Sequence, residues 1–107
     1  MTTENQQNNA QALLEKLRNQ NRQTATVIID DSFELIFHRD DAAFELLQNE
    51  ITENNKIVPV KDYLMAIVEP SQRDILTEIL KSQLLYAQIV EVVNNAFIPK
   101  IKVELKN

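Results

Sequence analysis

The chain contains no glycine among its 107 residues, which limits its turns and excludes several binding motifs. Glycine adopts positive φ without steric cost, so each tight turn here must use aspartate or asparagine instead. The candidates are Asp31 in a β-hairpin, Asn54 or Asn55 in a loop, and Asn94 or Asn95 near a helix end. Phosphate-binding loops and the GxGxxG motif need glycine where backbone approaches phosphate, so the sequence excludes both.

Cysteine is also absent, which excludes disulfides, thiolate zinc sites and a cysteine nucleophile. Apolar residues make up 44% of the chain, as in a globular protein, and the length suits one domain. The N-terminus lacks the basic stretch and apolar run of a signal peptide, and every apolar run is too short to span a bilayer. We therefore expect an intracellular, soluble protein with no membrane partner.

The net charge of −5 is distributed unevenly. Residues 24–80 carry twelve acidic and four basic side chains, a sum of −8, whereas residues 81–107 sum to +2, with four basic and two acidic. The one basic cluster, Lys100, Lys102 and Lys106, is interpreted as protection of a sheet edge rather than as a phosphate site. We therefore expect no nucleic-acid partner. A small acidic inhibitor that mimics DNA and binds a host protein is the alternative function.

Residues 1–23 form a polar leader in which ten residues are asparagine or glutamine. Such a composition buries too little apolar area to order the chain fully, so we expect partial disorder. A short amphipathic helix is predicted at about residues 9–19, because its apolar residues have helical spacing: Ala10, Leu13, Leu14 and Leu17. The three leucines are the candidate partner-binding residues. The alternative is that they dock on the chain's own domain or on another copy.

A β-hairpin is predicted after the leader, with strands at 24–29 and 33–39 around the loop at 30–32. A three-residue loop places the apolar side chains of both strands on one face, whereas a two-residue loop mixes the faces. The expected facing pairs are Ile29 with Phe33, Val27 with Leu35, and Ala25 with Phe37.

Four helices are predicted at about 40–51, 59–68, 71–80 and 83–97. The last stretch is rich in β-branched residues, but its length and its apolar spacing over three turns favour a helix. In the final segment Ile101, Val103 and Leu105 alternate with charged residues, which predicts a half-buried strand. The expected fold class is therefore α+β.

In that fold a three-stranded antiparallel sheet, made of the N-terminal hairpin plus a C-terminal strand, has about four helices packed on it and a short N-terminal helix besides. Residues 24–107 form the single α+β domain, and residues 1–23 are the leader.

The sequence lacks a catalytic constellation. His38 is the single histidine, and the kinase-like HRD at 38–40 has Glu45 where that motif requires asparagine. The aspartate pairs at 30–31 and 40–41 suit a turn and a helix cap better than a metal site, because no calcium-loop spacing surrounds them. We expect no enzyme activity, no cofactor and no bound metal.

From residue 55 onward, several short motifs follow one another in a characteristic order. They are N-K-I-V-P at 55–59, Y-L-M at 63–65, a leucine-rich helix at 75–80, Q-I at 88–89 and F-I-P-K-I-K-V at 97–103. Together with the hairpin, this order resembles a family of short tail assembly chaperones of phages and prophages, over about residues 24–107. Ser82-Gln83 stands where that family often has Pro-Gly, so we expect Ser82 to cap the last helix.

The resemblance implies a non-catalytic protein in the cytoplasm of the bacterial host cell. It implies that the protein binds the tape-measure protein of the tail, or another tail protein. The tape measure would thus stay soluble until tail-tube subunits polymerise around it. The protein is not expected in the mature virion, and self-association is left open.

Overall fold

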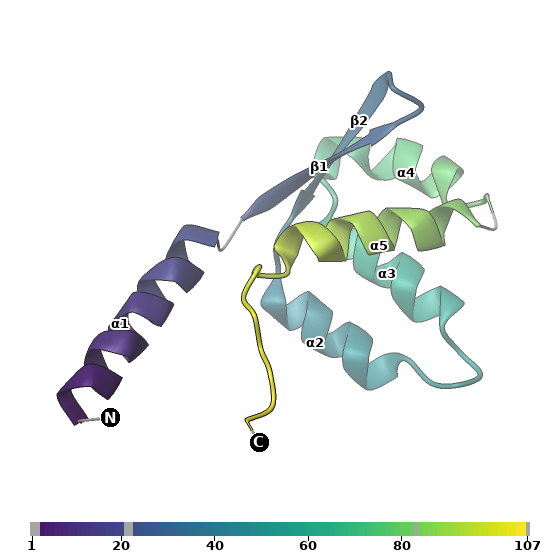
Figure 1. Ribbon diagram of the computed structural model, residues 1–107. Coiled ribbons are helices and arrows are strands. Elements are labelled where there is room, and N and C mark those ends of the chain that lie inside the picture. Colours follow the sequence, from purple (N-terminus) through teal and green to yellow (C-terminus); the bar gives the residue numbers. More distant parts are fainter. Residues whose placement is uncertain (1–2, 21–22, 83, 107) are drawn as a thin grey trace.

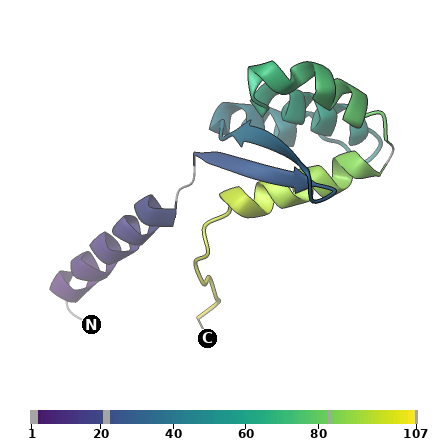
Figure 2. The same ribbon diagram turned by 90° about the horizontal axis from the view of Figure 1, so that it is seen from above.

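The computed structural model describes residues 3–20, 23–82 and 84–106. Their elements follow in this order: α1 (Thr3–Gln20), β1 (Thr24–Ile29), β2 (Phe33–His38), α2 (Asp41–Glu50), α3 (Ile57–Ile67), the 3₁₀ turn η1 (Pro70–Gln72), α4 (Arg73–Ile79) and α5 (Leu85–Phe97). The radius of gyration is 17.4 Å, against about 13 Å for a compact chain of this length. The excess arises because α1 and the C-terminal segment extend away from the body of the molecule (Figures 1 and 2).

The described sheet has two strands, so the three-stranded sheet expected from the sequence is wrong. Residues 101–106 have no regular structure, and the side chains of Val103 and Leu105 are 89% and 88% exposed. The start of α5 lies beside the end of β1, and the end of α5 lies beside Gln20. The chain therefore leaves α5 near the start of β1, whereas an antiparallel strand beside β1 would have to begin at the opposite end.

The N-terminal helix is also longer than the short helix that the leucine spacing predicted. It runs for 18 residues from Thr3 and includes the glutamine- and asparagine-rich stretch at 5–9. Strong helix formers at 10–18 nucleate it, and Arg18 in the last turn interacts favourably with the helix dipole. The structure thus has five α-helices in its described part, one of which is this extended α1.

The hairpin has the predicted three-residue loop and the predicted facing pairs. Asp30 and Asp31 adopt the left-handed conformation, with φ of 54° and 58°, and Ser32 N donates to Ile29 O at 3.3 Å. They are the only described residues with positive φ, so the expectation for the four asparagines is wrong. The loop at 52–55 closes through paired backbone hydrogen bonds instead, and α5 continues through residues 94–95 without a turn.

One edge of the sheet is closed by a side chain. Glu69 N donates to Ile36 O of β2 at 2.7 Å. The amide of Gln72 accepts a hydrogen bond from Ile36 N and donates one to Glu34 O, each at 2.8 Å. Gln72 therefore supplies the hydrogen bonds that a neighbouring strand would make, and it satisfies the outer edge of β2.

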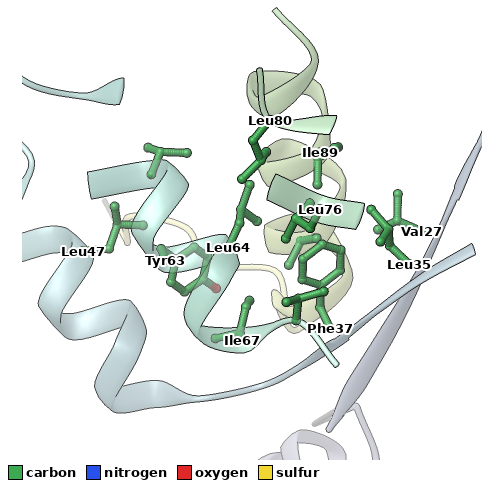
Figure 3. Packing of buried hydrophobic residues seen from close by; sticks show 13 residues of the cluster. Val27, Leu35, Phe37, Leu47, Tyr63, Leu64, Ile67, Leu76, Leu80 and Ile89 are labelled. Carbon is green, nitrogen blue, oxygen red and sulfur yellow. The ribbon is translucent and has the colours of Figure 1, made fainter. Parts of the chain in front are cut away.

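The hydrophobic core lies between one face of the hairpin and helices α2 to α5 (Figure 3). Its fully buried side chains include Leu35 and Phe37 from β2, Leu64 from α3 and Leu76 from α4. Helix α5 contributes Ile89 and Val93, which are four positions apart and so share one face. The helix predicted at 83–97 is therefore confirmed.

Helix α2 begins at a capped aspartate, as predicted. The Asp40 carboxylate accepts a hydrogen bond from Ala43 N at 3.0 Å. The predicted Ser82 cap is wrong, because Leu84 occupies the N-cap position of α5 and makes no side-chain cap. Ser82 N donates to Ile79 O at 3.1 Å and so belongs to the turn that ends α4.

Candidate functional site

The three leucines predicted to bind a partner lie on α1, which projects away from the body (Figure 2). Leu13 and Leu14 are about half exposed, and Leu17 is partly buried. Because they are spaced at i, i+1 and i+4, they share one face of the helix. We call α1 the N-terminal arm. It presents the apolar stripe that the sequence predicted, and binding by this stripe stays a prediction.

A second exposed apolar segment follows α5. Its exposed apolar residues are Ile98, Val103 and Leu105. We call residues 98–106 the C-terminal arm. The alternation in this segment predicts a half-buried strand, whereas in the structure these side chains lie in solvent. The molecule thus exposes apolar side chains on two extensions rather than on one.

The two arms meet at the same end of the body. Lys100 N donates to Gln20 Oε1 at 2.7 Å, which links the start of the C-terminal arm to the end of α1. A cavity of about 390 Å³ lies at this junction, lined by the end of α1, the end of α5 and residues 98 and 100. Both arms therefore leave the body near the start of β1 (Figure 1).

An apolar cavity of about 310 Å³ lies close to this end, between α2, α3 and the end of α5. Phe44 and Tyr63 form one wall, with ring centroids 6.0 Å apart in an edge-to-face arrangement. Tyr63 Oη donates to Asn94 Oδ1 at 3.2 Å. The pKa of Tyr63 is raised by burial and further by the carboxylates of Asp40 and Asp41, so the phenol stays protonated near neutral pH.

Arg39 borders the same cavity. Its Nε donates to Asp41 Oδ1 at 2.9 Å, and its Nη1 is buried with no hydrogen-bond partner in the described part of the chain. A buried donor without an acceptor costs stability. In the sequence, Arg39 stands out only as part of the HRD motif. The cavity itself is not visible there, because its other wall residues come from distant segments.

The remaining candidate residues take structural roles. Asp30 and Asp31 form the hairpin turn, and Asp40 caps α2. His38 Nε2 lies 2.6 Å from Glu69 Oε2, and this exposed pair joins the end of β2 to the segment before η1. Within the described residues, no three acidic, histidine or cysteine side chains are grouped so that they could hold a metal ion.

Comparison with known proteins identifies the family of the chain. A family model described as phage tail assembly chaperone matches residues 25–107. The chain belongs to this phage tail assembly chaperone family. A protein of Haemophilus phage HP1 (strain HP1c1), named "Uncharacterized 11.3 kDa protein in lys 3'region", is 41% identical over 98 residues, 92% of this chain and 95% of the phage protein. No solved structure matches.

The match to the HP1 protein bears on the N-terminal arm of this tail assembly chaperone. The aligned stretch of 98 residues leaves at most nine of 107 unmatched, so it must extend into the leader and include residues 10–17. The aligned stretch therefore spans the positions of the three leucines, although the family model begins only at residue 25. Within the described residues, no helix is both long and apolar enough to cross a membrane.

Proposed function

We propose that this tail assembly chaperone binds the tape-measure protein and keeps it soluble in the bacterial cytoplasm until the tail tube forms around it. The observation that supports this most directly is the exposed apolar face of the N-terminal arm, in a chain that belongs to a chaperone family. An amphipathic helix of this kind can pack its apolar stripe against a partner helix. The role is non-catalytic, and the chaperone leaves before the virion is complete.

The stripe of Leu13, Leu14 and Leu17 is proposed as the contact. Fully burying an exposed leucine side chain is worth roughly 1.5–3 kcal/mol, and these leucines are half exposed or less, so the stripe supplies part of the free energy that holds a client protein. Because α1 stands clear of the core, its leucines are available to a partner without unfolding the body. This makes binding compatible with later release.

Co-expression of the chain with the tape-measure protein of the same phage tests the proposal. We expect a co-purifying complex and a soluble tape measure. Replacing the three leucines by serine should lower recovery of the complex at least tenfold. The matched control replaces Asn8, Ala12 and Glu15 by serine, because these exposed residues lie on the opposite face of α1.

Retained binding in the leucine variant would show that the stripe is not the contact. A tape measure that is soluble alone and forms no complex with the wild-type chain would refute the proposed partner itself. The two outcomes are separate, since the first concerns only the surface.

A further inference from the structure

The outer edge of β1 is open, in contrast to the closed edge of β2. In an antiparallel pair of strands, two facing residues behave alike: their backbone N–H and C=O groups either point toward the partner strand or point away from it. Ile36 and Glu34 point away from β1, because they bond to Gln72. Their facing residues Thr26 and Ile28 therefore direct N–H and C=O away from β2, and within the described residues no hydrogen bond reaches these groups.

Strand β1 also lacks the features that usually protect an open edge. Its six residues, TATVII, include no charge and no proline, and its pairing with β2 is regular without a bulge. Natural proteins place such features on exposed edges to prevent pairing with another chain. Their absence here indicates that the edge of β1 is a surface for binding an extended segment.

A groove of about 260 Å³ runs beside this edge, between β1 and α5. Ile28 of β1 and Val92 of α5 line it and are 61% and 51% exposed. Leu85 and Gln88 lie along the same wall, and Asp30 is the single charged residue of the lining. A strand added to β1 would direct every second side chain onto the apolar residues of α5.

The C-terminal arm matches this groove in pattern and length. Val103 and Leu105 alternate with Lys102, Glu104 and Lys106, so one face of the extended arm is apolar and the other is charged. The seven residues 100–106, at about 3.3 Å each, span roughly 23 Å. This is enough to cover the six residues of β1, which span roughly 20 Å. Val103 and Leu105, the most exposed large apolar side chains among the described residues, thus have the spacing that the groove requires.

The charges of the two surfaces are complementary. Residues 100–106 carry three lysines and one glutamate, a sum of +2. The hairpin from Thr24 to His38 carries three acidic residues, Asp30, Asp31 and Glu34, and no lysine or arginine. Helix α5 adds Glu91 and no basic residue. The arm is therefore attracted to the hairpin and α5 of another copy, although each whole chain is acidic.

We propose that the C-terminal arm of one copy binds along the open edge of β1 in a second copy, and that the exchange is reciprocal in a closed dimer. Within one chain, the hydrogen bond from Lys100 to Gln20 holds the start of the arm beside α1, and the arm leads away from the body (Figure 2). Exchange between two chains satisfies the edge of each β1 and covers Val103 and Leu105. The inference is independent of the tape-measure proposal.

Disulfide trapping tests which chain supplies the arm, because the wild-type chain has no cysteine. Thr26 lies on the exposed face of β1, and Glu104 lies on the charged face of the arm, so the two become neighbours in the dimer. A chain with Thr26→Cys is mixed with a chain carrying Glu104→Cys and oxidised. We expect a disulfide-linked heterodimer. Its yield should be at least ten times that of a control in which Glu50→Cys, at an exposed site at the end of α2, takes the place of Glu104→Cys.

The oligomeric state of the full chain, measured by light scattering on a sizing column, provides the second test. We expect a dimer whose dissociation constant rises at least tenfold with Val103→Ser and Leu105→Ser. The matched control, Lys102→Ser with Glu104→Ser, changes the other face and leaves the net charge of the arm unchanged, so it should remain dimeric. Because the arm is exposed, both variants should unfold at the same denaturant concentration as wild type when monomeric.

Three outcomes overturn the proposal. The first is a monomer at every concentration. The second is a dimer whose dissociation constant is unchanged by the serine substitutions in the arm, but which dissociates when the leucines of α1 are replaced. The third is a disulfide that forms only within one chain when Thr26→Cys and Glu104→Cys are combined.

Discussion

The body of the molecule and its two arms carry similar apolar patterns but use them in opposite ways. In the body, residues 24–97, Phe37 and Leu64 are fully buried. In the arms, Leu14 belongs to a helical apolar stripe and Val103 to an alternating apolar pattern, and both side chains remain exposed. Burial of such a side chain stabilises a fold by roughly 1.5–3 kcal/mol. The core of the body thus uses its apolar residues for stability, whereas the exposed apolar residues of the arms remain available to other chains.

The comparison shows that amphipathic spacing identifies which residues will be buried together but not which molecule will bury them. Helix α5 and the N-terminal arm both follow helical spacing, yet only α5 packs on the hairpin. In α5 the apolar face is wide and continuous, whereas α1 has a narrow stripe among amides. A narrow stripe supports a smaller contact, which suits reversible binding.

The largest effect should come from truncating matched apolar residues in the two regions. Phe37→Ala removes a fully buried ring and should lower the free energy of unfolding by about 3–5 kcal/mol. Leu14→Ala on the N-terminal arm should change it by less than about 0.5 kcal/mol. Urea denaturation followed by circular dichroism measures both. Equal losses of unfolding free energy would show that the N-terminal arm belongs to the core, and would remove the distinction between body and arm.

The closed edge of the sheet can be tested through Gln72. Gln72→Ala leaves Ile36 N and Glu34 O without their partner, so we expect the free energy of unfolding to fall by about 1–3 kcal/mol. Gln48→Ala, at an exposed position of α2, is the control and should change little. If both variants behave alike in urea, the glutamine does not close the edge, and the contrast with β1 is lost.

The start of α2 should show a smaller effect. Asp40→Ala removes the acceptor of the Ala43 N hydrogen bond and should cost about 1 kcal/mol. Asp40→Asn keeps an acceptor at the same position, so most of the stability should remain. Thermal and urea unfolding of the two variants give the comparison. A loss of equal size in both would assign the role of Asp40 to its charge rather than to capping.

The alkaline limit of stability should depend on Tyr63. Burial, and then Asp40 and Asp41, raise the pKa of Tyr63 above its usual value of about 10. The folded state therefore holds this proton more tightly than the unfolded state. The resulting stability is complete below pH of about 10 and is lost as pH rises through the folded pKa.

Tyr63→Phe removes the titrating group and should flatten the fall in unfolding free energy above pH 10, although it also loses the bond to Asn94. Urea unfolding of both proteins between pH 8 and 11 is the measurement. If the unfolding free energies of the two proteins fall in parallel with pH, the pKa of the phenol is the same in the folded and unfolded states.

Much of the body could be predicted from the sequence, because its signals are local. The loop length determined the hairpin register, since one register alone places all six apolar side chains on one face. The C-terminal segment could not be placed, because its pairing depends on where α5 ends relative to β1. The bonds of Gln72 were missed because a glutamine before a helix carries no sign of a partner 36 or 38 positions away.

The candidate site was predicted in part. The leucines of α1 lie on the predicted helix, which is longer than expected because glutamine and asparagine extend it. The cavity beside Tyr63 was missed, since its walls come from residues 39–44, 63 and 94–99, which only the packing of three helices brings together. No pattern within a single segment indicates such a cavity.

The hydrogen bond between Lys100 and Gln20 joins residues 80 positions apart and holds the starts of both arms at one end of the molecule. Both arms begin at one end, and the Asp30-Asp31 turn lies at the other end of β1. A fluorescent dye attached at the turn would follow tumbling of the body without touching a ligand held by the N-terminal arm. A second dye on an arm would then report, as a change in distance between the dyes, when that arm engages another chain.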